Sequence, residues 1–156
     1  MNVFIVRHGH SPMQDSDHQR PLSDLGQAQA RQAAGFIRQN TDTVPYILCS
    51  DAVRTHQTAA QIAAVFGIEE CDARNEFYTA GVGIWCDAIL EQAKQPALVL
   101  VGHNPTISQL SAYLTGDEDI YFKPACVTHI RLEIRGDGLR LPAQLIANFK
   151  PDAKPQ

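Results

Sequence analysis

The sequence predicts an α/β protein, a three-layer sandwich whose mostly parallel central sheet is flanked by helices. Short apolar runs typical of buried strands alternate with segments of helical periodicity for most of the length. Near the end, Gly136-Asp137-Gly138 joins two strand-like segments, so we expect a closing hairpin and at least one antiparallel strand. The 156 residues, 44% hydrophobic and 19% charged, suffice for a sizeable core.

The first half of the chain predicts two strands, each followed by a helix. Residues 1–6, rich in Val, Ile and Phe, are typical of a fully buried parallel strand, and residues 46–49 form a second apolar run. Ser23 is placed to cap the first helix. Either Ser50 or Asp51 is placed to cap the second.

The second half repeats this alternation and ends in the hairpin. We expect, in order, a short strand at 68–73, a helix at 85–94, a buried strand at 97–101, a helix ending near residue 114, and strands at 126–134 and 140–149. Asn104 suits the N-cap of the last helix and Pro105 its first position. No linker or repeat stands out, so we expect one domain over residues 1–150 and a polar tail at 151–156.

The composition argues against several classes of protein. The net charge of −4, without a basic stripe, argues against nucleic acid as the main partner. The first residues lack the layout of a signal peptide, and no apolar run approaches the roughly 20 residues that span a bilayer. The four cysteines (Cys49, Cys71, Cys86 and Cys126) form no CxxC pair, which favours free thiols over disulfides or a zinc site. We therefore expect a cytoplasmic protein with no membrane partner.

Basic residues gather where three of the expected strands end. The first strand ends in Arg7-His8-Gly9, Arg54 lies in the first helical turn after the second, and the strand ending at Val101 leads to His103. In such sheets, ligands bind outside the carboxyl ends of the strands. Arginine side chains grip phosphate with two donors, and helix N-termini add backbone N–H groups. The sequence therefore predicts a site for a phosphate group.

The residue types also predict a reaction. A neutral imidazole can attack phosphorus and form a phosphohistidine, so His8 is the candidate nucleophile. The positive charge of Arg7 and Arg54 should keep its ring neutral. Both arginines and the second histidine would stabilise the charge on the phosphoryl oxygens during transfer. This scheme requires no metal or other cofactor, and Asp15 and Asp17 lack a further carboxylate at the spacing of a metal site.

Four short motifs follow one another along most of the chain. In order, they are Arg7-His8-Gly9, Pro21-Leu22-Ser23-Asp24-Leu25-Gly26-Gln27-Ala28, Ser50 with Arg54-Thr55-His56-Gln57-Thr58-Ala59, and Gly102-His103-Asn104-Pro105. This ordered combination closely resembles the histidine phosphatase (phosphoglycerate-mutase-like) superfamily. The short length and the run Arg20-Pro21-Leu22-Ser23 look most like its SixA-type protein-phosphohistidine phosphatases.

The resemblance implies roles for individual residues. In the family, the catalytic phosphate pocket is formed by the residues that match His8, Arg7, Arg54 and His103. Glu76 is the best positional match to the general acid of the family, and a structural role is the alternative. Arg20 is a candidate substrate contact or else a solvated loop arginine. Only residues 77–95 correspond to the insertion that covers the site in larger members, so we expect an open pocket.

Three functions fit these observations. The first is a metal-independent phosphatase with a phosphohistidine intermediate, which removes phosphate from phosphohistidine on a signalling or phosphotransfer protein. The second is a phosphatase for a small phosphorylated metabolite, and it predicts a pocket closed by residues 77–95. The third is a non-catalytic module that binds phosphate or protein. Such modules usually lack the nucleophile or an arginine, and this chain retains both.

Overall fold

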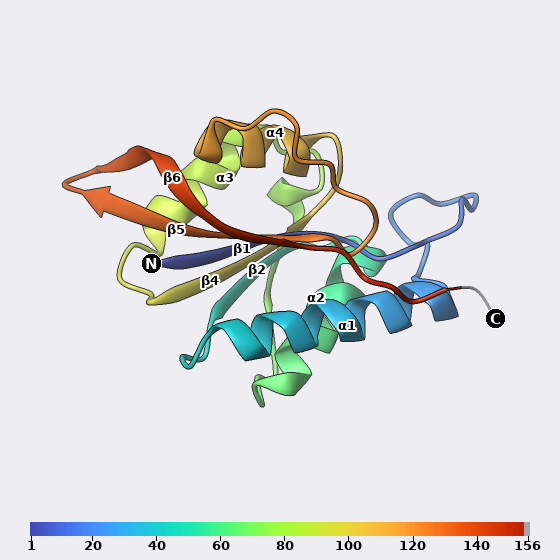
Figure 1. The fold of residues 1–156 in the computed structure, drawn as a ribbon. Coiled ribbons are helices and arrows are strands. Elements are labelled where there is room, and N and C mark those ends of the chain that lie inside the picture. The colour runs from blue at the N-terminus through green and yellow to red at the C-terminus, as the bar shows by residue number, and fades with distance from the viewer. Residues whose placement is uncertain (155–156) are drawn as a thin grey trace.

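The computed structural model describes residues 1–154, and its elements form three layers (Figure 1). In chain order they are β1 (Asn2–Arg7), α1 (Asp24–Asn40), β2 (Tyr46–Ser50), α2 (Val53–Val65), β3 (Asp72–Arg74), the 3₁₀ helix η1 (Asn75–Phe77), α3 (Val82–Glu91), β4 (Ala97–Gly102), α4 (Thr106–Thr115), β5 (Val127–Arg135) and β6 (Gly138–Phe149). Helices α1 and α2 cover one face of the sheet, and α3 and α4 cover the other (Figure 1).

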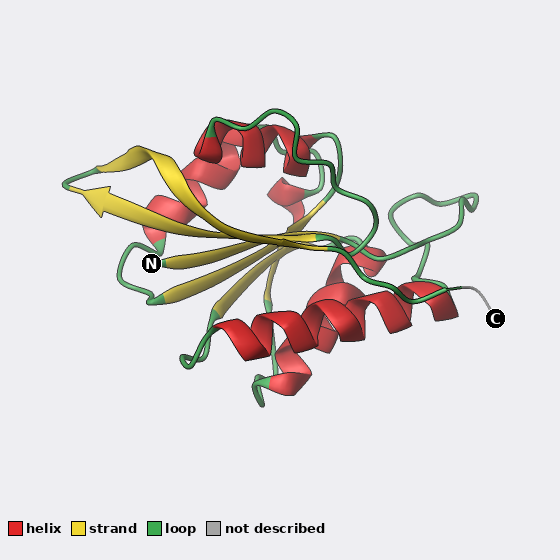
Figure 2. Ribbon diagram, viewed as in Figure 1, coloured by secondary structure: helices red, strands yellow, loops and turns green. Residues whose placement is uncertain are grey.

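The sheet has six strands in the order β3-β2-β4-β1-β5-β6, so β1 lies near its middle. Strands β3, β2, β4 and β1 run parallel to one another. Strand β5 pairs antiparallel with β1, and β6 pairs antiparallel with β5. The prediction of a mostly parallel sheet with an antiparallel hairpin is therefore confirmed. Figure 2 shows the end of this hairpin extending beyond the helices.

The strands send side chains to a hydrophobic core on each face of the sheet. In β1, Val3 and Ile5 belong to the core under α3 and α4, whereas Phe4 and Val6 belong to the core under α1 and α2. All four are fully buried, and each such side chain stabilises the fold by about 1.5–3 kcal/mol. Because β1 is packed on both faces and paired along both edges, its carboxyl end is a fixed support for the residues that follow.

One of the predicted helix caps is confirmed and the other is wrong. The Oγ atom of Ser23 accepts a hydrogen bond from the backbone N–H of Gly26 at 3.0 Å, so Ser23 caps α1 as predicted. The N-cap of α2 is Ala52, which has no side-chain hydrogen bond, rather than Ser50 or Asp51. Ser50 is the last residue of β2, and its hydroxyl accepts a hydrogen bond from the backbone N–H of Ala52 at 3.2 Å.

The start of α4 also differs from the prediction. The N-cap is Pro105 and the helix begins at Thr106, one residue later than expected. The side chain of Asn104 still satisfies the helix, because its Oδ1 accepts from the backbone N–H of Ser108 at 3.1 Å. The predicted capping chemistry is present, but it acts from one position further upstream.

Three other boundaries differ from the sequence predictions. Helix α3 begins at Val82, before the expected residue 85, because Val82 still packs against the core. The strand expected at 68–73 is confined to Asp72–Arg74. In the hairpin, the last strand begins at Gly138 rather than at residue 140, and Gly138 pairs with Arg135. The domain boundary at residue 150 stays a prediction. Within residues 1–154, no helix has the length and apolar character needed to cross a membrane.

Candidate active site

The two histidines of interest follow neighbouring strands. Arg7, the last residue of β1, is in register with Gly102, the last residue of β4. His8 and His103 therefore leave the sheet side by side, and their ring centroids are 5.3 Å apart. The backbone N–H of His8 also donates to the Gly102 carbonyl at 3.2 Å, which extends the ladder by one residue. This is the carboxyl edge of the parallel strands, where ligands of such sheets bind.

The ring of His8 is held in one tautomer. Its Nδ1 atom lies 2.7 Å from the carbonyl oxygen of Gly9. A carbonyl oxygen can only accept, so Nδ1 carries the proton and Nε2 keeps its lone pair. Burial lowers the pKa of His8 to about 3, and the nearby charges of Arg54 and Arg7 add to this. The ring is therefore neutral at physiological pH, with a lone pair available on Nε2.

His103 is neutral for a similar reason. Burial, followed by the charge of Arg54, lowers its pKa to about 4. Its Nε2 atom lies 2.9 Å from Oγ of Ser50 at the end of β2. The ring of Tyr78 stands edge-on to it, with centroids 5.6 Å apart. The Nδ1 atom of His103 is buried and has no hydrogen-bond partner within residues 1–154.

Arg54 is almost fully buried and is held by Asp17. Its Nη1 donates to the backbone carbonyl of Asp17 at 2.6 Å, and its Nη2 donates to Oδ2 of Asp17 at 3.1 Å. The same carboxylate accepts from the Tyr78 hydroxyl at 2.5 Å and from Nε of Arg20 at 3.0 Å. These bonds, led by the one from Tyr78, hold the pKa of Asp17 well below its usual range. Asp17 is therefore a carboxylate that joins two arginines.

Arg7 is held by a different group of contacts. Its Nη1 donates to the carbonyl of Phe122 at 2.9 Å, and that carbonyl also accepts from the Asn104 side chain at 3.1 Å. Burial lowers the pKa of Arg7. The Nε atoms of Arg7 and Arg54 are buried without a partner among the described residues. Unpaired buried donors are costly, and an anionic ligand would satisfy them.

Close backbone packing fixes the loop that follows β1. A Cβ atom on Gly9 would lie 2.6 Å from the carbonyl oxygen of Gly26 in α1, and one on Gly26 would lie 2.1 Å from that of His10. Only glycine allows the loop and the first turn of α1 to approach this closely. The backbone N–H of Gly9 also donates to Oγ1 of Thr58 on α2 at 3.1 Å. The loop is thus tied to both helices of that face.

A cavity of about 230 Å³ lies between these groups. It is lined by Arg7, His8, Gly9, His10, Ser11, Met13, Arg20, Arg54, His103, Asn104 and Pro124. The structure thus brings together five of the residues selected from the sequence, the two histidines and three arginines. None of residues 77–95 lines this cavity, although Tyr78 contacts His103 and Asp17 beside it.

The structure does not bring Glu76 into this cavity. Glu76 lies on η1, is exposed, and forms an ion pair with Arg74 at 3.3 Å. Conversely, sequence reasoning missed Asp17 as a partner of the arginines and Tyr78 as its partner. It treated Asp17 as a metal ligand to be rejected, and no sequence pattern signals the contact with Arg54. Within residues 1–154, no group of three His, Cys, Asp or Glu side chains is placed to hold a metal ion.

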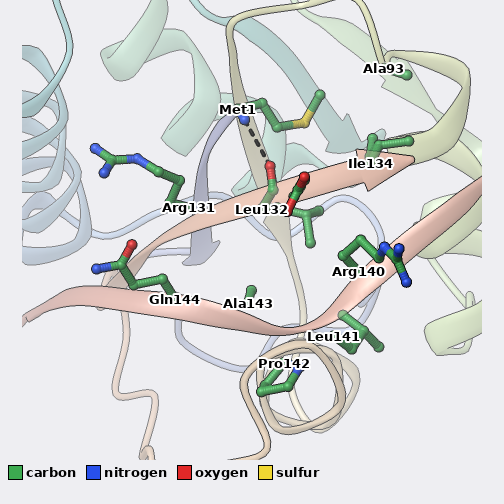
Figure 3. Close-up of a pocket in the computed structure, with 11 residues that line it drawn as sticks. Met1, Ala93, Arg131, Leu132, Ile134, Arg140, Leu141, Pro142, Ala143 and Gln144 are labelled. Atoms are coloured by element: carbon green, nitrogen blue, oxygen red, sulfur yellow. Dashed lines mark hydrogen bonds between the residues drawn. The ribbon is translucent and has the colours of Figure 1, made fainter. Parts of the chain in front are cut away.

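A second, larger cavity of about 590 Å³ lies against the β5–β6 hairpin (Figure 3). Arg131 and Arg140 stand at opposite ends of it in Figure 3 and do not converge on one point. Its lining contains no histidine, cysteine or hydroxyl that could act as a nucleophile. The smaller cavity, where two histidines and three arginines meet, is therefore the candidate active site.

Comparison with known proteins decides the family. The model of the histidine phosphatase superfamily (branch 1) matches residues 3–88. The chain belongs to the histidine phosphatase superfamily. The match includes His8, Arg7, Arg54 and Arg20, and it ends before His103.

Two relatives align with more of this histidine phosphatase than the family model does. An uncharacterised protein of Mycobacterium tuberculosis, MT1313, is 36% identical over 114 residues, which cover 70% of this chain and 69% of that protein. Phosphohistidine phosphatase SixA of Escherichia coli is 25% identical over 145 residues, which cover 88% of this chain and 89% of SixA.

Solved structures agree on the fold. The protein histidine phosphatase SixA in complex with tungstate has a TM-score of 0.82 at 19% identity, over 96% of this chain and 97% of that one. A mycobacterial glucosyl-3-phosphoglycerate phosphatase has a TM-score of 0.65 at 16% identity, over 83% and 89%. At such identities the likeness establishes the fold. The family and the fold together support a phosphatase, and thus a hydrolase of phosphorylated substrates.

Proposed function

We propose that this histidine phosphatase takes the phosphoryl group onto Nε2 of His8, passes it to water without a metal, and acts on phosphohistidine of a signalling or phosphotransfer protein. The observation that carries the proposal is the state of His8. Its Nδ1–H is fixed on the Gly9 carbonyl and its ring is neutral, so the lone pair on Nε2 is available.

In the first step the Nε2 lone pair of His8 attacks phosphorus and forms a P–N bond. The bond from phosphorus to the leaving group breaks, and the leaving group keeps the electron pair. In the second step water attacks phosphorus, the P–N bond breaks, and its electrons return to Nε2. The products are inorganic phosphate and neutral His8. The phosphoryl transition state carries negative charge on its outer oxygens.

The arginines and His103 are placed to stabilise this charge. Arg7 and Arg54 each have a buried Nε–H without a partner within residues 1–154, and Arg20 lines the same cavity. Fixed positive charge in a largely buried site is the usual largest contribution to such a transfer. These three guanidinium groups offer the positive charge that a metal ion supplies in other phosphoryl-transfer enzymes.

Two observations favour phosphohistidine as the substrate. The cavity is small, about 230 Å³, which suits a phosphoryl group displayed on a protein surface. No carboxylate lines it, and imidazole, with a pKa near ~6.5, is an easier leaving group than an alkoxide. The similarity to SixA over most of both chains points in the same direction. A cytoplasmic location, where thiols stay reduced, fits the four free cysteines.

A small phosphorylated metabolite is the second candidate. The structural likeness to a glucosyl-3-phosphoglycerate phosphatase favours it, but that likeness concerns the fold. A metabolite phosphatase needs contacts beyond the phosphate, and residues 77–95, which would supply a cover, do not line the cavity.

The test compares wild type with His8→Ala on a histidine-phosphorylated phosphotransfer domain and on a panel of small phosphoesters. His56→Ala is the matched control, because His56 is exposed on α2. We expect rapid phosphate release from the phosphoprotein, unchanged by His56→Ala, by EDTA or by dialysis, and lost in His8→Ala. Faster turnover of one small phosphoester would instead identify a phosphorylated metabolite as the substrate. No turnover of any substrate would favour a binding module instead.

A further inference from the structure

A groove lies beside the catalytic cavity, between the loop before β5 and the end of β6. Its volume is about 110 Å³. It is lined by Ile120, Tyr121, Lys123, Cys126, Val127, Thr128, Asn148, Phe149 and Lys150. We call it the lysine groove. The same loop contacts the catalytic residues, because the backbone N–H of Ala125 donates to the carbonyls of Arg7 and His8, both at 3.0 Å.

Two like charges stand together in the lysine groove. The chain has four lysines and a net charge of −4, yet Lys123 and Lys150 line this one groove. Neither forms an ion pair with a carboxylate of residues 1–154. The close approach of Lys123 lowers the pKa of Lys150. Neighbouring cations without a counter-charge repel each other, and an anionic group placed between them removes that repulsion.

Exposed apolar side chains accompany the charges. Tyr121, in the lysine groove, is 74% exposed, and Met13, which lines the catalytic cavity, is 81% exposed. No other large hydrophobic side chain of residues 1–154 is as exposed as these two. They come from different loops, one before α1 and one before β5. Apolar side chains left in water around a functional site are typical of surfaces that bind another protein.

We propose that Tyr121, Lys123 and Lys150 form a docking surface for the phosphorylated protein, which places an acidic segment in the lysine groove while its phosphoryl group enters the catalytic cavity. The proposal rests on the proposed function. The occupant is acidic because the two ammonium groups lack counter-charges, and it is a protein because the exposed Tyr121 and Met13 extend the surface beyond the cavity.

The docking proposal predicts that removal of these groove side chains affects the binding of a protein substrate and not the chemical step. None of the three groove side chains lines the catalytic cavity or contacts the ring of His8. Removing them should weaken the encounter with a protein substrate, which surface charge steers. It should leave the turnover of a substrate that is no larger than the catalytic cavity unchanged.

The experiment measures kcat and KM of the Lys123→Gln/Lys150→Gln double variant and of Tyr121→Ser. The controls are Lys94→Gln and Tyr113→Ser, exposed residues on other surfaces. The substrates are a histidine-phosphorylated phosphotransfer domain and p-nitrophenyl phosphate. On the phosphoprotein we expect kcat/KM to fall about tenfold, mainly through KM, with a weaker salt dependence for the lysine variant. On p-nitrophenyl phosphate and in the controls we expect changes below about twofold.

Each other outcome has a distinct meaning. Equal losses on both substrates would show that the groove acts through the catalytic residues and would overturn the docking proposal. If the wild type hydrolyses the phosphoprotein and the groove variants do so with the same kcat/KM, the docking role of the lysine groove would be overturned and the proposed function would stand. A wild type that hydrolyses p-nitrophenyl phosphate but not the phosphoprotein would overturn the proposed substrate, and the docking surface with it.

Discussion

Asp17 holds Arg54 by two contacts, 2.6 Å from Nη1 to the Asp17 carbonyl and 3.1 Å from Nη2 to the carboxylate. The loop residue thus fixes the direction of a buried guanidinium that belongs to α2. The Tyr78 hydroxyl and Arg20 bind the same carboxylate, so the cavity wall depends on one exposed residue.

The first prediction concerns this contact. In Asp17→Ala, Arg54 and Arg20 lose their common partner, and we expect kcat to fall about tenfold, as for one lost charge-assisted hydrogen bond. The pocket also becomes more positive, so inhibition by inorganic phosphate should stay equal or strengthen. Steady-state kinetics with phosphate as a competing inhibitor measures both. Asp15→Ala, in the same loop, is the control. An unchanged kcat would mean that Asp17 does not orient the arginines.

The second prediction concerns acid sensitivity. The folded pKa values of His8 and His103, about 3 and about 4, lie below the value of about 6.5 in an unfolded chain. Between these values the unfolded chain binds protons that the folded protein does not, so stability falls as the pH falls from about 6.5. The slope is at most about 1.4 kcal/mol per pH unit for each histidine.

Urea unfolding at several pH values between 5 and 7.5 measures this slope in wild type, His103→Gln and the exposed control His56→Gln. We expect a shallower slope for His103→Gln only. The same slope in all three proteins would contradict the prediction. The activity attributed to His8 should not decline through a pKa near 6.5, since its ring stays neutral across that range.

The third prediction uses two glycines of α1. A Cβ on Gly26 would lie 2.1 Å from the His10 carbonyl, whereas one on Gly35 would meet nothing within 4 Å. Gly26→Ala should therefore lower the free energy of unfolding by about 1–3 kcal/mol and displace the loop that carries His10. Gly35→Ala should raise it by up to about 1 kcal/mol, because alanine favours a helix. Chemical denaturation of both variants tests the pair, and equal effects would refute the contact.

The fourth prediction concerns Glu76. Its carboxylate pairs with Arg74 and does not line the cavity, so we expect Glu76→Gln to change kcat/KM by less than about twofold. The measurement compares the phosphoprotein with an alkyl phosphate, whose leaving group needs a proton. A large loss on the alkyl phosphate alone would instead assign Glu76 the role of general acid.

The parts of the site that lie on strands could be predicted from the sequence. The apolar run before Arg7 fixes β1, and the run before Gly102 fixes β4, so the residues after them had to meet at one edge. The cap of α2 could not be predicted, because the Ser50 hydroxyl contacts His103, which is 53 residues away in the chain. Capping rules use only residues that are close in the sequence, so they do not account for such a partner.

The contacts of Asp17 could not be predicted from the sequence for the same reason. Asp17 lies in an exposed loop without periodicity, and its partners Arg54 and Tyr78 are 37 and 61 residues away. For Glu76, the role of general acid stays a prediction. A position in a motif places a residue on the right segment, but the direction of its side chain depends on neighbours, and Arg74 takes the carboxylate.

The register between Arg7 and Gly102 makes this chain a scaffold for redesign. The two histidines depend on paired central strands, whereas Tyr121 and Lys123 lie on a connection that pairs with no strand. The exposed side chains of Tyr121 and Lys123 could therefore be exchanged for others of different charge, while Phe122 is kept because its carbonyl holds Arg7 and Asn104. A set of such variants would share one active site and differ in the surface that they offer to a substrate, so that selectivity could be altered without touching the strands that carry the histidines.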